Sequence, residues 1–187
     1  MKRGHKWLIW AGVTLVAVSL CAAAVFAVSQ HRGMRQAEDI AQRIEDVLPP
    51  RTIGAKEAYS AMQMPALNVD GEDFIGLVEI PAYGIKLPVC DTWKATKLNR
   101  YPCRFWGTVY DGSLIVGGGA KQLACLGQIQ NGDSVRVTDM QGAVFTYTVT
   151  RIRRADHADR DTLQSEAALT LFARDGYNVE YIIVECM

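Results

Sequence analysis

The chain has 187 residues and a formal net charge of zero, with 20 basic and 20 acidic side chains. That length suits one domain with accessory segments. The balanced charge gives no reason to expect a nucleic acid or another polyanion as a partner. The three histidines are scattered and no Cys-x-x-Cys spacing occurs, so the sequence predicts neither a metal site nor a cofactor.

The N-terminal region contains an apolar stretch without any charge, residues 7–29. About 20 apolar residues in a helix cross a hydrocarbon layer of about 30 Å. Basic residues within 1–6 favour a cytoplasmic N-terminus, although basic residues also follow the stretch. The alternative is a cleaved signal peptide, whose apolar core is shorter, roughly 7–15 residues. We predict a single-pass anchor in the plasma membrane, with the rest of the chain outside the cytoplasm.

A juxtamembrane helix and linker are predicted to follow over residues 30–73. Apolar residues recur at i, i+4, i+7 and i+8, which is one face of a helix, at Ile40, Ile44, Val47 and Leu48. The pair Pro49-Pro50 ends this pattern. We expect the helix to be a stalk that rests on the following domain or on a partner. The remainder up to Asp73 is interpreted as a linker or a wrapped arm.

Residues 74–187 show short runs of β-forming residues that alternate with turn signals. In "AVFTYTVTRI" the residues Phe145, Tyr147 and Val149 alternate with threonines, which indicates a half-buried strand. Only the stretch from about Asp161 to Ala168 has a helical pattern. Many short strands with few helices predict an all-β domain, either a closed barrel or a sandwich.

Three consecutive glycines close a run of β-forming residues in "LIVGGGAKQ", residues 114–122. A phosphate-binding P-loop needs G-x-x-x-x-G-K-[ST], but here Lys121 is followed by Gln122 and the distant first glycine is missing. A dinucleotide fingerprint needs a βαβ unit, which the surrounding strands do not offer. The pattern is typical of a flexible corner between a strand and a loop.

The order of the segments is more informative than any one of them. "FIGLVEIPAYGIKLPV" is followed by "YPCRFWGTVYDGSLIVGG", by "LACLGQIQNGDSVRVTDMQGAVFTYTV" and, near the end, by "ALTLFARDGYNVEYIIVEC". From Phe74 to Cys186 this order resembles the sortases, membrane-anchored cysteine transpeptidases of Gram-positive bacteria, particularly class B and clostridial forms. The resemblance implies a closed, sortase-like β-barrel with short helices at the cell surface.

The resemblance also implies where catalytic groups should lie. Sortases use a thiol that attacks a backbone carbonyl of a sorting signal, an imidazole that transfers protons and a guanidinium that stabilises the oxyanion. The histidine position falls on Gly118, the cysteine position on Arg174 and the arginine position on Tyr181, or on Glu180 with a shift of one residue. A guanidinium stays protonated and cannot act as a nucleophile. We therefore expect no catalytic residue at these degenerate positions.

Cys125 and His157 are the remaining candidates for a relocated nucleophile and base. His157 lies in "RRADHADRD", which by resemblance is a loop that borders the substrate groove of sortases. The alternative is structural. Cys125 has apolar neighbours, among which a free thiol acts as a small hydrophobic group, and His157 lies in a charged, solvated loop. We favour the structural interpretation of both residues.

Four cysteines lie outside the predicted anchor, namely Cys90, Cys103, Cys125 and Cys186. An exported domain can oxidise them, but four thiols allow three complete pairings and the sequence does not choose among these. Related sequences often carry a cysteine at the places of Cys103 and Cys186. By that resemblance, these two are interpreted as structural residues or as a candidate disulfide.

The expected function is that of a catalytically silent, sortase-like module at the cell surface. It would hold a sorting-signal-like peptide, or assist an active sortase, during surface-protein sorting or pilus assembly. Arg174 would bind a ligand carboxylate, unless Asp175 or Glu180 neutralises it. Two alternatives stay open: an active cysteine transpeptidase with relocated catalytic residues, and a purely structural stalked domain without a ligand.

Overall fold

The computed structural model describes residues 15–20, 34–53, 63–176 and 179–187. In the described ranges, helix covers residues 15–20 and 34–47, and three short helical elements lie within the domain: η1 (Pro81–Tyr83), η2 (Ala124–Gly127) and α3 (Arg160–Leu163). The strands are β1 (Thr52–Ile53), β2 (Leu67–Val69), β3 (Glu72–Ile80), β4 (Ile85–Cys90), β5 (Cys103–Trp106), β6 (Leu114–Gly118), β7 (Ser134–Asp139), β8 (Ala143–Ala155), β9 (Leu169–Arg174) and β10 (Tyr181–Cys186).

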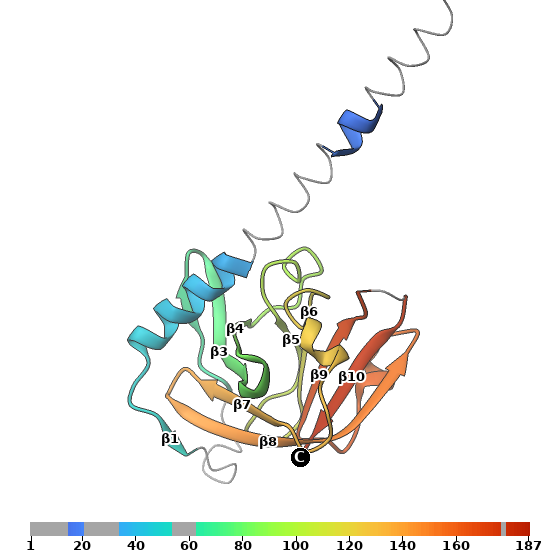
Figure 1. The fold of residues 1–187 in the computed structure, drawn as a ribbon. Helices are drawn as coiled ribbons and strands as arrows, with labels where there is room; N and C mark the ends of the chain where they lie inside the picture. The colour runs from blue at the N-terminus through green and yellow to red at the C-terminus, as the bar shows by residue number, and fades with distance from the viewer. Residues whose placement is uncertain (1–14, 21–33, 54–62, 177–178) are drawn as a thin grey trace, which may run out of the picture.

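The strands close into a barrel (Figure 1). Their order in the ten-stranded sheet is β1-β8-β10-β9-β6-β5-β4-β3-β2, and β7 pairs with both β3 and β8. Because β7 joins the two sides of this sheet, all strands except β1 and β2 form one closed ring of eight. The predicted all-β, closed barrel with few short helices is therefore confirmed.

Alternation along β8 shows how the sequence selects this architecture. Phe145, Tyr147 and Val149 are buried, whereas Thr146 and Thr148 between them are exposed. Successive side chains of a strand point to opposite faces, so this pattern buries one face only. The predicted half-buried strand is confirmed.

A buried carboxylate organises the turn between β7 and β8. Asp139 is fully buried, and its Oδ1 accepts hydrogen bonds from the backbone N–H groups of Gln141 and Ala143, both at 2.9 Å. The hydroxyl of Tyr110 donates to Oδ2 of Asp139 at 2.7 Å. Both carboxylate oxygens are thus satisfied, which a charge away from water requires. The turn is thereby attached to the segment before β6.

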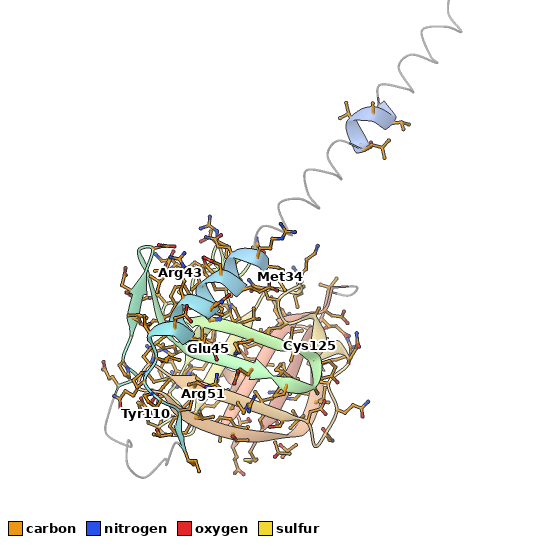
Figure 2. All side chains as sticks on the ribbon, turned by 60° about the vertical axis from the view of Figure 1, so that its left-hand side comes forward. Met34, Arg43, Glu45, Arg51, Tyr110 and Cys125 are labelled. Carbon is orange, nitrogen blue, oxygen red and sulfur yellow. The ribbon has the colours of Figure 1, made fainter. Side chains whose placement is uncertain are left out.

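The helix over residues 34–47 packs on the barrel, and Figure 2 shows it lying against the sheet from Met34 to beyond Glu45. Ile40 and Ile44 are buried, as the predicted helix face requires, but Val47 is 64% exposed. The prediction for Val47 was wrong because Ala37 and Ala41 are also buried. At 100° per residue the two alanines shift the centre of the buried face away from Val47.

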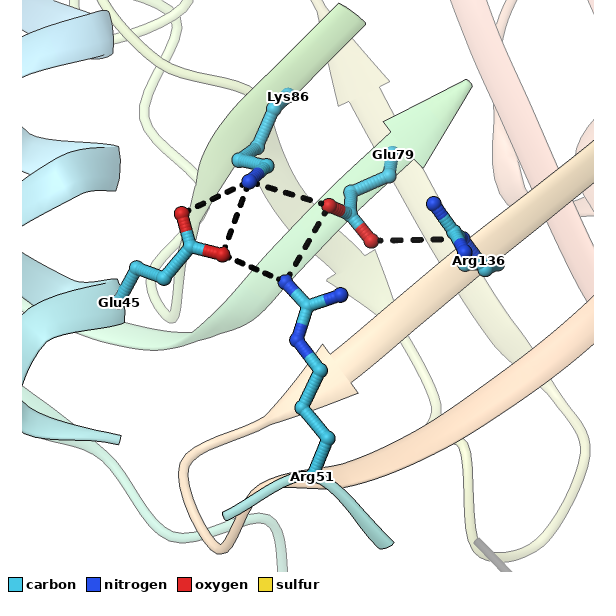
Figure 3. A network of polar contacts seen from close by, with 5 residues as sticks. All are labelled: Glu45, Arg51, Glu79, Lys86 and Arg136. Atoms are coloured by element: carbon cyan, nitrogen blue, oxygen red, sulfur yellow. Dashed lines mark hydrogen bonds and ion pairs between the residues drawn. The ribbon is translucent and has the colours of Figure 1, made fainter. Parts of the chain in front are cut away.

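An ion-pair network joins this helix to the barrel (Figure 3). Glu79 of β3 has a side chain only 5% exposed and lies within 3.4–3.5 Å of cationic nitrogens from Arg51, Lys86 and Arg136. Lys86 and Arg51 also contact Glu45 of the helix, both at 2.7 Å. The hydrogen bond from Lys86 lowers the pKa of the Glu45 carboxyl. A buried carboxylate needs such partners because desolvation penalises its charge.

The segment before β3 wraps around the barrel rather than standing apart from it. β1 pairs in parallel with β8, and β2 forms a hairpin with β3. Ile40, Ile44 and Met64 belong to the same hydrophobic core as Phe74. The core therefore extends across the predicted domain boundary between residues 73 and 74.

The predicted membrane anchor over residues 7–29 lies outside the described residues except for 15–20, which are helical and exposed. Within the described ranges, no helix combines the length and the apolar character needed to cross a bilayer.

Candidate functional site

The three positions at which the resemblance predicts catalytic groups, 118, 174 and 181, lie at one end of three adjacent strands. β6 pairs in parallel with β9, which sets Gly118 beside Ala173. β9 pairs antiparallel with β10, which sets Arg174 opposite Tyr181. Residues that are far apart in the sequence are thus brought together at the ends of β6 and β9 and the start of β10. We take this end of the three strands as the candidate site.

The three glycines at the end of β6 are required by close neighbours. A Cβ atom at Gly118 would lie 2.6 Å from Cδ1 of Leu123, and one at Gly119 would lie 2.4 Å from the carbonyl oxygen of Leu98. A Cβ atom at Gly117 would meet the rings of Phe172 and Trp93 at 2.5 and 2.6 Å. None of the three has a positive φ. Close packing, rather than backbone freedom, therefore explains the glycine run.

The space next to Gly118 is accordingly filled by an aliphatic side chain. Leu123 is buried in the barrel core, and its N–H donates to the carbonyl of Gly119 at 3.1 Å, which closes the turn after the glycines. A side chain at position 118 would have to displace Leu123. The structure thus places glycine and leucine where the resemblance puts a histidine.

A second hydrophobic cluster, separate from the barrel core, covers the opposite face of the same strands. Its buried members are Ile115, Leu163, Phe172 and Ile183, and Trp93, Phe105 and Tyr181 pack against them. The ring centroids of Trp93 and Phe105 both lie 5.6 Å from that of Phe172, and the Tyr181 ring lies 6.3 Å from it. We call these seven residues the aromatic cluster. Trp93, Phe105 and Tyr181 are only half-buried, and Tyr181 is the register partner of Arg174, so the partly exposed edge of the cluster lies beside Arg174.

Arg174 lies exposed at the edge of the aromatic cluster. Its Nε donates to the carbonyl of Val179 at 3.4 Å, and it forms no ion pair with the residues that the structure describes. The two acidic candidates for neutralising it are Asp175 and Glu180, and both pair with Arg154, at 2.5 and 3.8 Å. These bonds raise the pKa of Arg154, the one from Asp175 most. Among the described residues, the exposed guanidinium of Arg174 therefore has no carboxylate partner.

A second cation lies near the cluster, on the side of β5. Trp106 is 46% exposed, and the guanidinium carbon of Arg160 lies 3.7 Å from the centroid of its ring. Trp106 pairs with Ile115 of β6, so this cation–π contact lies along the same group of strands. The site thus combines the aromatic cluster with exposed cationic and aromatic side chains.

The candidate relocated pair has little of the character of an active site. Cys125 is buried in the barrel core, and burial raises the pKa of its thiol to about 11. His157 is exposed in the loop after β8. No hydrogen bond joins the two within the described part of the chain. A thiol with a raised pKa supplies almost no thiolate at neutral pH.

One thiol that sequence reasoning did not single out has the opposite character. The hydrogen bond from Cys103 lowers the pKa of Cys90 against the opposing effect of burial, and a backbone hydrogen bond from Thr92 and the nearby Lys97 ammonium add to the lowering. Cys90 is nevertheless only 1% exposed. The available signal was that Cys90 and Cys103 flank a single loop between two β-forming runs.

Comparisons with known proteins agree with this fold. The chain matches the Sortase domain family model over residues 78–183, more than half its length. No match emerges from comparison with the sequences of curated proteins.

Three solved structures illustrate the structural similarity. Clostridium perfringens sortase C, solved with the C-terminal cell wall sorting motif, is 15% identical over 85% of this chain and 89% of its own, with a TM-score of 0.54. Streptococcus agalactiae sortase C1 is 18% identical over 83% and 87%, with a TM-score of 0.53. A Clostridium perfringens sortase D5 transpeptidase is 18% identical over 61% and 78%, with a TM-score of 0.53. The chain therefore belongs to the sortase family.

Proposed function

We propose that this sortase-family protein binds a sorting-signal-like peptide without cleaving it, as an accessory module in surface-protein sorting or pilus assembly. We further propose that residues 7–29 anchor it in the plasma membrane of a Gram-positive cell, with the barrel outside. The apolar stretch in the sequence supports the anchor. The cell-surface role of the sortase family supports the location.

The argument for inactivity rests on the side chains at the candidate site. Acyl transfer by a sortase needs a nucleophile, a proton carrier and an oxyanion partner. Positions 118, 174 and 181 hold glycine, arginine and tyrosine. Loss of a covalent nucleophile from such a unit typically costs on the order of a millionfold in rate. Packing of Leu123 against Gly118 supports the view that this site no longer has room for an imidazole.

The observation that carries the binding proposal is the exposed Arg174 next to the aromatic cluster. Its guanidinium has no ion-pair partner among the described residues, because Arg154 takes both neighbouring carboxylates. An extended peptide with an acidic group would pack against the aromatic cluster and pair its carboxylate with the Arg174 guanidinium. It would also contact the rings of Trp106 and Tyr181. The similarity to a sortase C solved with a cell wall sorting motif favours a peptide over other ligands.

The alternative of an active transpeptidase using Cys125 and His157 is not favoured. Burial raises the pKa of Cys125, while His157 lies exposed in a loop. Cys90 is the thiol with a lowered pKa, but it is buried and its partners are Cys103 and Lys97 rather than an imidazole.

The test measures peptide binding and covalent chemistry in one preparation. The probe is an array of fluorescent peptides that covers the C-terminal sorting segments of surface proteins from the same genome, applied to the full-length chain in mild detergent. We expect reversible binding of a subset of peptides. Arg174→Glu should weaken that binding at least tenfold, whereas Arg35→Glu, the same charge change on the exposed side of the helix, should not. Intact-mass measurement should find no peptide adduct.

Two outcomes would overturn the proposal. Equal loss of binding in both variants would mean that net charge, and not Arg174, attracts the peptide. A thioacyl adduct on any cysteine, or transfer of the peptide to an added amine, would identify an active transpeptidase instead.

A further inference from the structure

The end of β4 and the start of β5 bring two cysteines together. Cys90 and Cys103 are direct partners in the parallel pairing of these strands. Both are buried in the barrel core, 1% and 0% exposed. Neighbouring strands lie about 4.8 Å apart, and disulfides join Cα atoms that are about 4.4–6.8 Å apart. The backbone positions of the two residues therefore suit a disulfide.

Each thiol affects the ionisation of the other, because their interaction lowers the pKa of Cys90 and raises that of Cys103. The Cys103 thiol donates to the carbonyl of Tyr101 at 3.6 Å. The ammonium of Lys97 lies 3.7 Å from Sγ of Cys90 and also pairs with Glu72. The N–H of Cys90 donates to the carbonyl of Pro102 at 2.8 Å, which holds the two strand ends in register.

We infer that Cys90 and Cys103 form an intramolecular disulfide in the mature protein. This choice goes beyond the sequence, which left three complete pairings open. It differs from the resemblance-based candidate, Cys103 with Cys186. Cys186 lies on β10, and the strands β9 and β6 separate β10 from β5, which carries Cys103. Cys125 lies in η2 and has no hydrogen bond to Cys186 in the described part of the chain.

The chemistry is thiol–disulfide exchange with an oxidant of the disulfide class, either a small-molecule disulfide or a disulfide oxidoreductase. The Cys90 thiolate attacks one sulfur of the oxidant, forming a mixed disulfide and releasing the other sulfur as a thiolate, which takes up a proton. Cys103 then loses its proton and attacks Sγ of Cys90, which expels the second thiol. Two protein thiols are oxidised and one disulfide is reduced to two thiols. Because both cysteines are buried once the barrel has closed, the exchange takes place during folding, and the order in which the two cysteines react can equally be reversed.

The disulfide would close the loop over residues 91–102, which holds part of the candidate site in place. Trp93 of this loop packs on Phe172, and its ring lies 2.6 Å from where a Cβ atom of Gly117 would be. The carbonyl oxygen of Leu98 lies 2.4 Å from where a Cβ atom of Gly119 would be. A covalent closure at the base of the loop therefore restricts the segment that covers the end of β6. The inference does not depend on the proposed peptide binding.

The test is a non-reducing peptide map of the full-length chain. The protein is unfolded in urea with dithiothreitol, refolded in a mixture of reduced and oxidised glutathione, alkylated and cut with trypsin. The sequence predicts that Cys90 is released in the peptide 87–94 and Cys103 in the peptide 101–104. We expect these two peptides to be recovered as one cross-linked species, two hydrogen atoms lighter than their sum.

Variants and a second measurement separate the pair from the other thiols. Cys125→Ser should leave the cross-link intact, whereas Cys90→Ser and Cys103→Ser should each abolish it and leave the remaining cysteine alkylated. The oxidised wild-type protein should unfold at a higher urea concentration than the reduced protein, and Cys90→Ser should lose this difference. Hydrogen exchange within the loop 91–102 should slow on oxidation.

The inference is overturned if both peptides carry alkylated cysteines after refolding in glutathione. A cross-link of either one to the Cys125 peptide 122–136, or to the Cys186 peptide 175–187, would equally overturn it.

Discussion

At the residue scale, the glycine run shows how packing, rather than chemistry, determines the identity of three consecutive positions. A glycine usually signals a turn with positive φ or a close approach of the backbone to another group. Here the second reason applies, because a Cβ atom at Gly118 would lie 2.6 Å from the Leu123 side chain. The position at which the resemblance predicts a histidine is thus packed into the barrel core. An imidazole at this position would require the core to be repacked.

A double-mutant cycle tests this contact. Gly118→Ala should destabilise the protein by about 1–3 kcal/mol, because Leu123 must leave its position. Leu123→Ala alone should cost about 2–5 kcal/mol, and the double variant should cost clearly less than the sum of the two. Urea unfolding measures all three values. Gly127→Ala is the matched control, since its Cβ atom would lie 3.7 Å from Ile182, an ordinary contact. Additive costs would show that the contact is absent.

Buried thiols make the stability depend on alkaline pH. Burial raises the pKa of Cys125 to about 11 and that of Cys186 to about 12. A group whose folded pKa is raised contributes stability that is present below the unfolded pKa, about 8.5, and is lost as the pH rises through the folded pKa. For Cys125 the loss approaches about 3 kcal/mol near pH 11, at about 1.4 kcal/mol per pKa unit.

This pH dependence is measured by urea unfolding at pH 7, 9 and 10.5 with a phosphine reductant. The free energy of unfolding should fall across this series. Cys125→Ala should show a shallower fall above pH 9, whatever its stability at pH 7. Parallel curves for the variant and the wild-type protein would mean that Cys125 ionises in the folded state as easily as in water.

At the scale of elements, the helix over residues 34–47 is part of the barrel and not a free stalk. Ala37, Ile40, Ala41 and Ile44 form its buried face, and Glu45 joins it to Lys86 of β4. Burial of its apolar face against the sheet supplies most of the stability of such a helix. The ion pairs of Glu45 are partly exposed and contribute orientation more than free energy.

Two substitutions in the same turn of the helix test its role. Ile44→Ala removes a fully buried side chain and should lower the free energy of unfolding by about 2–4 kcal/mol. Val47→Ala removes an exposed side chain, 64% accessible, and should change it by less than about 0.5 kcal/mol. Thermal or urea unfolding measures both. Equal, small effects would mean that the helix does not contribute to the stability of the barrel.

At the scale of the whole molecule, closure of the barrel decides which residues meet. β7 pairs with β3 and β8 and so brings the first and last parts of the domain together. The hydrophobic core includes Met64 and the buried face of the helix, both before residue 74. The folding unit therefore begins at the helix, earlier than the boundary at residue 74 that the sequence texture suggests.

Two truncations test this extent. A chain that starts at residue 34 keeps the helix, β1 and β2 and should unfold cooperatively. A chain that starts at residue 74 loses Ile40 and Ile44 from the core, each contributing about 1.5–3 kcal/mol, against a total stability of about 5–15 kcal/mol for a domain. We expect it to aggregate or to unfold without a sharp transition in circular dichroism. The same unfolding midpoint for both chains would place the boundary at residue 74 after all.

The amino-acid sequence alone determined the strand-rich texture, the buried face of β8 and the collinear order of segments that resembles sortases. It also shows glycine, arginine and tyrosine at positions 118, 174 and 181, where the resemblance predicts an imidazole, a thiol and a guanidinium. These properties are local or depend only on order along the chain, and the side-chain period of a strand is readable within a few residues.

Only the tertiary structure decided which residues are neighbours. It set Gly118 beside Ala173 and Arg174 opposite Tyr181, filled the space at Gly118 with Leu123, and selected Cys103 as the partner of Cys90. It also turned Val47 out to solvent. The reason is physical: strand register and order depend on contacts between segments far apart in the chain, and a shift of one residue moves every side chain of a strand to the other face.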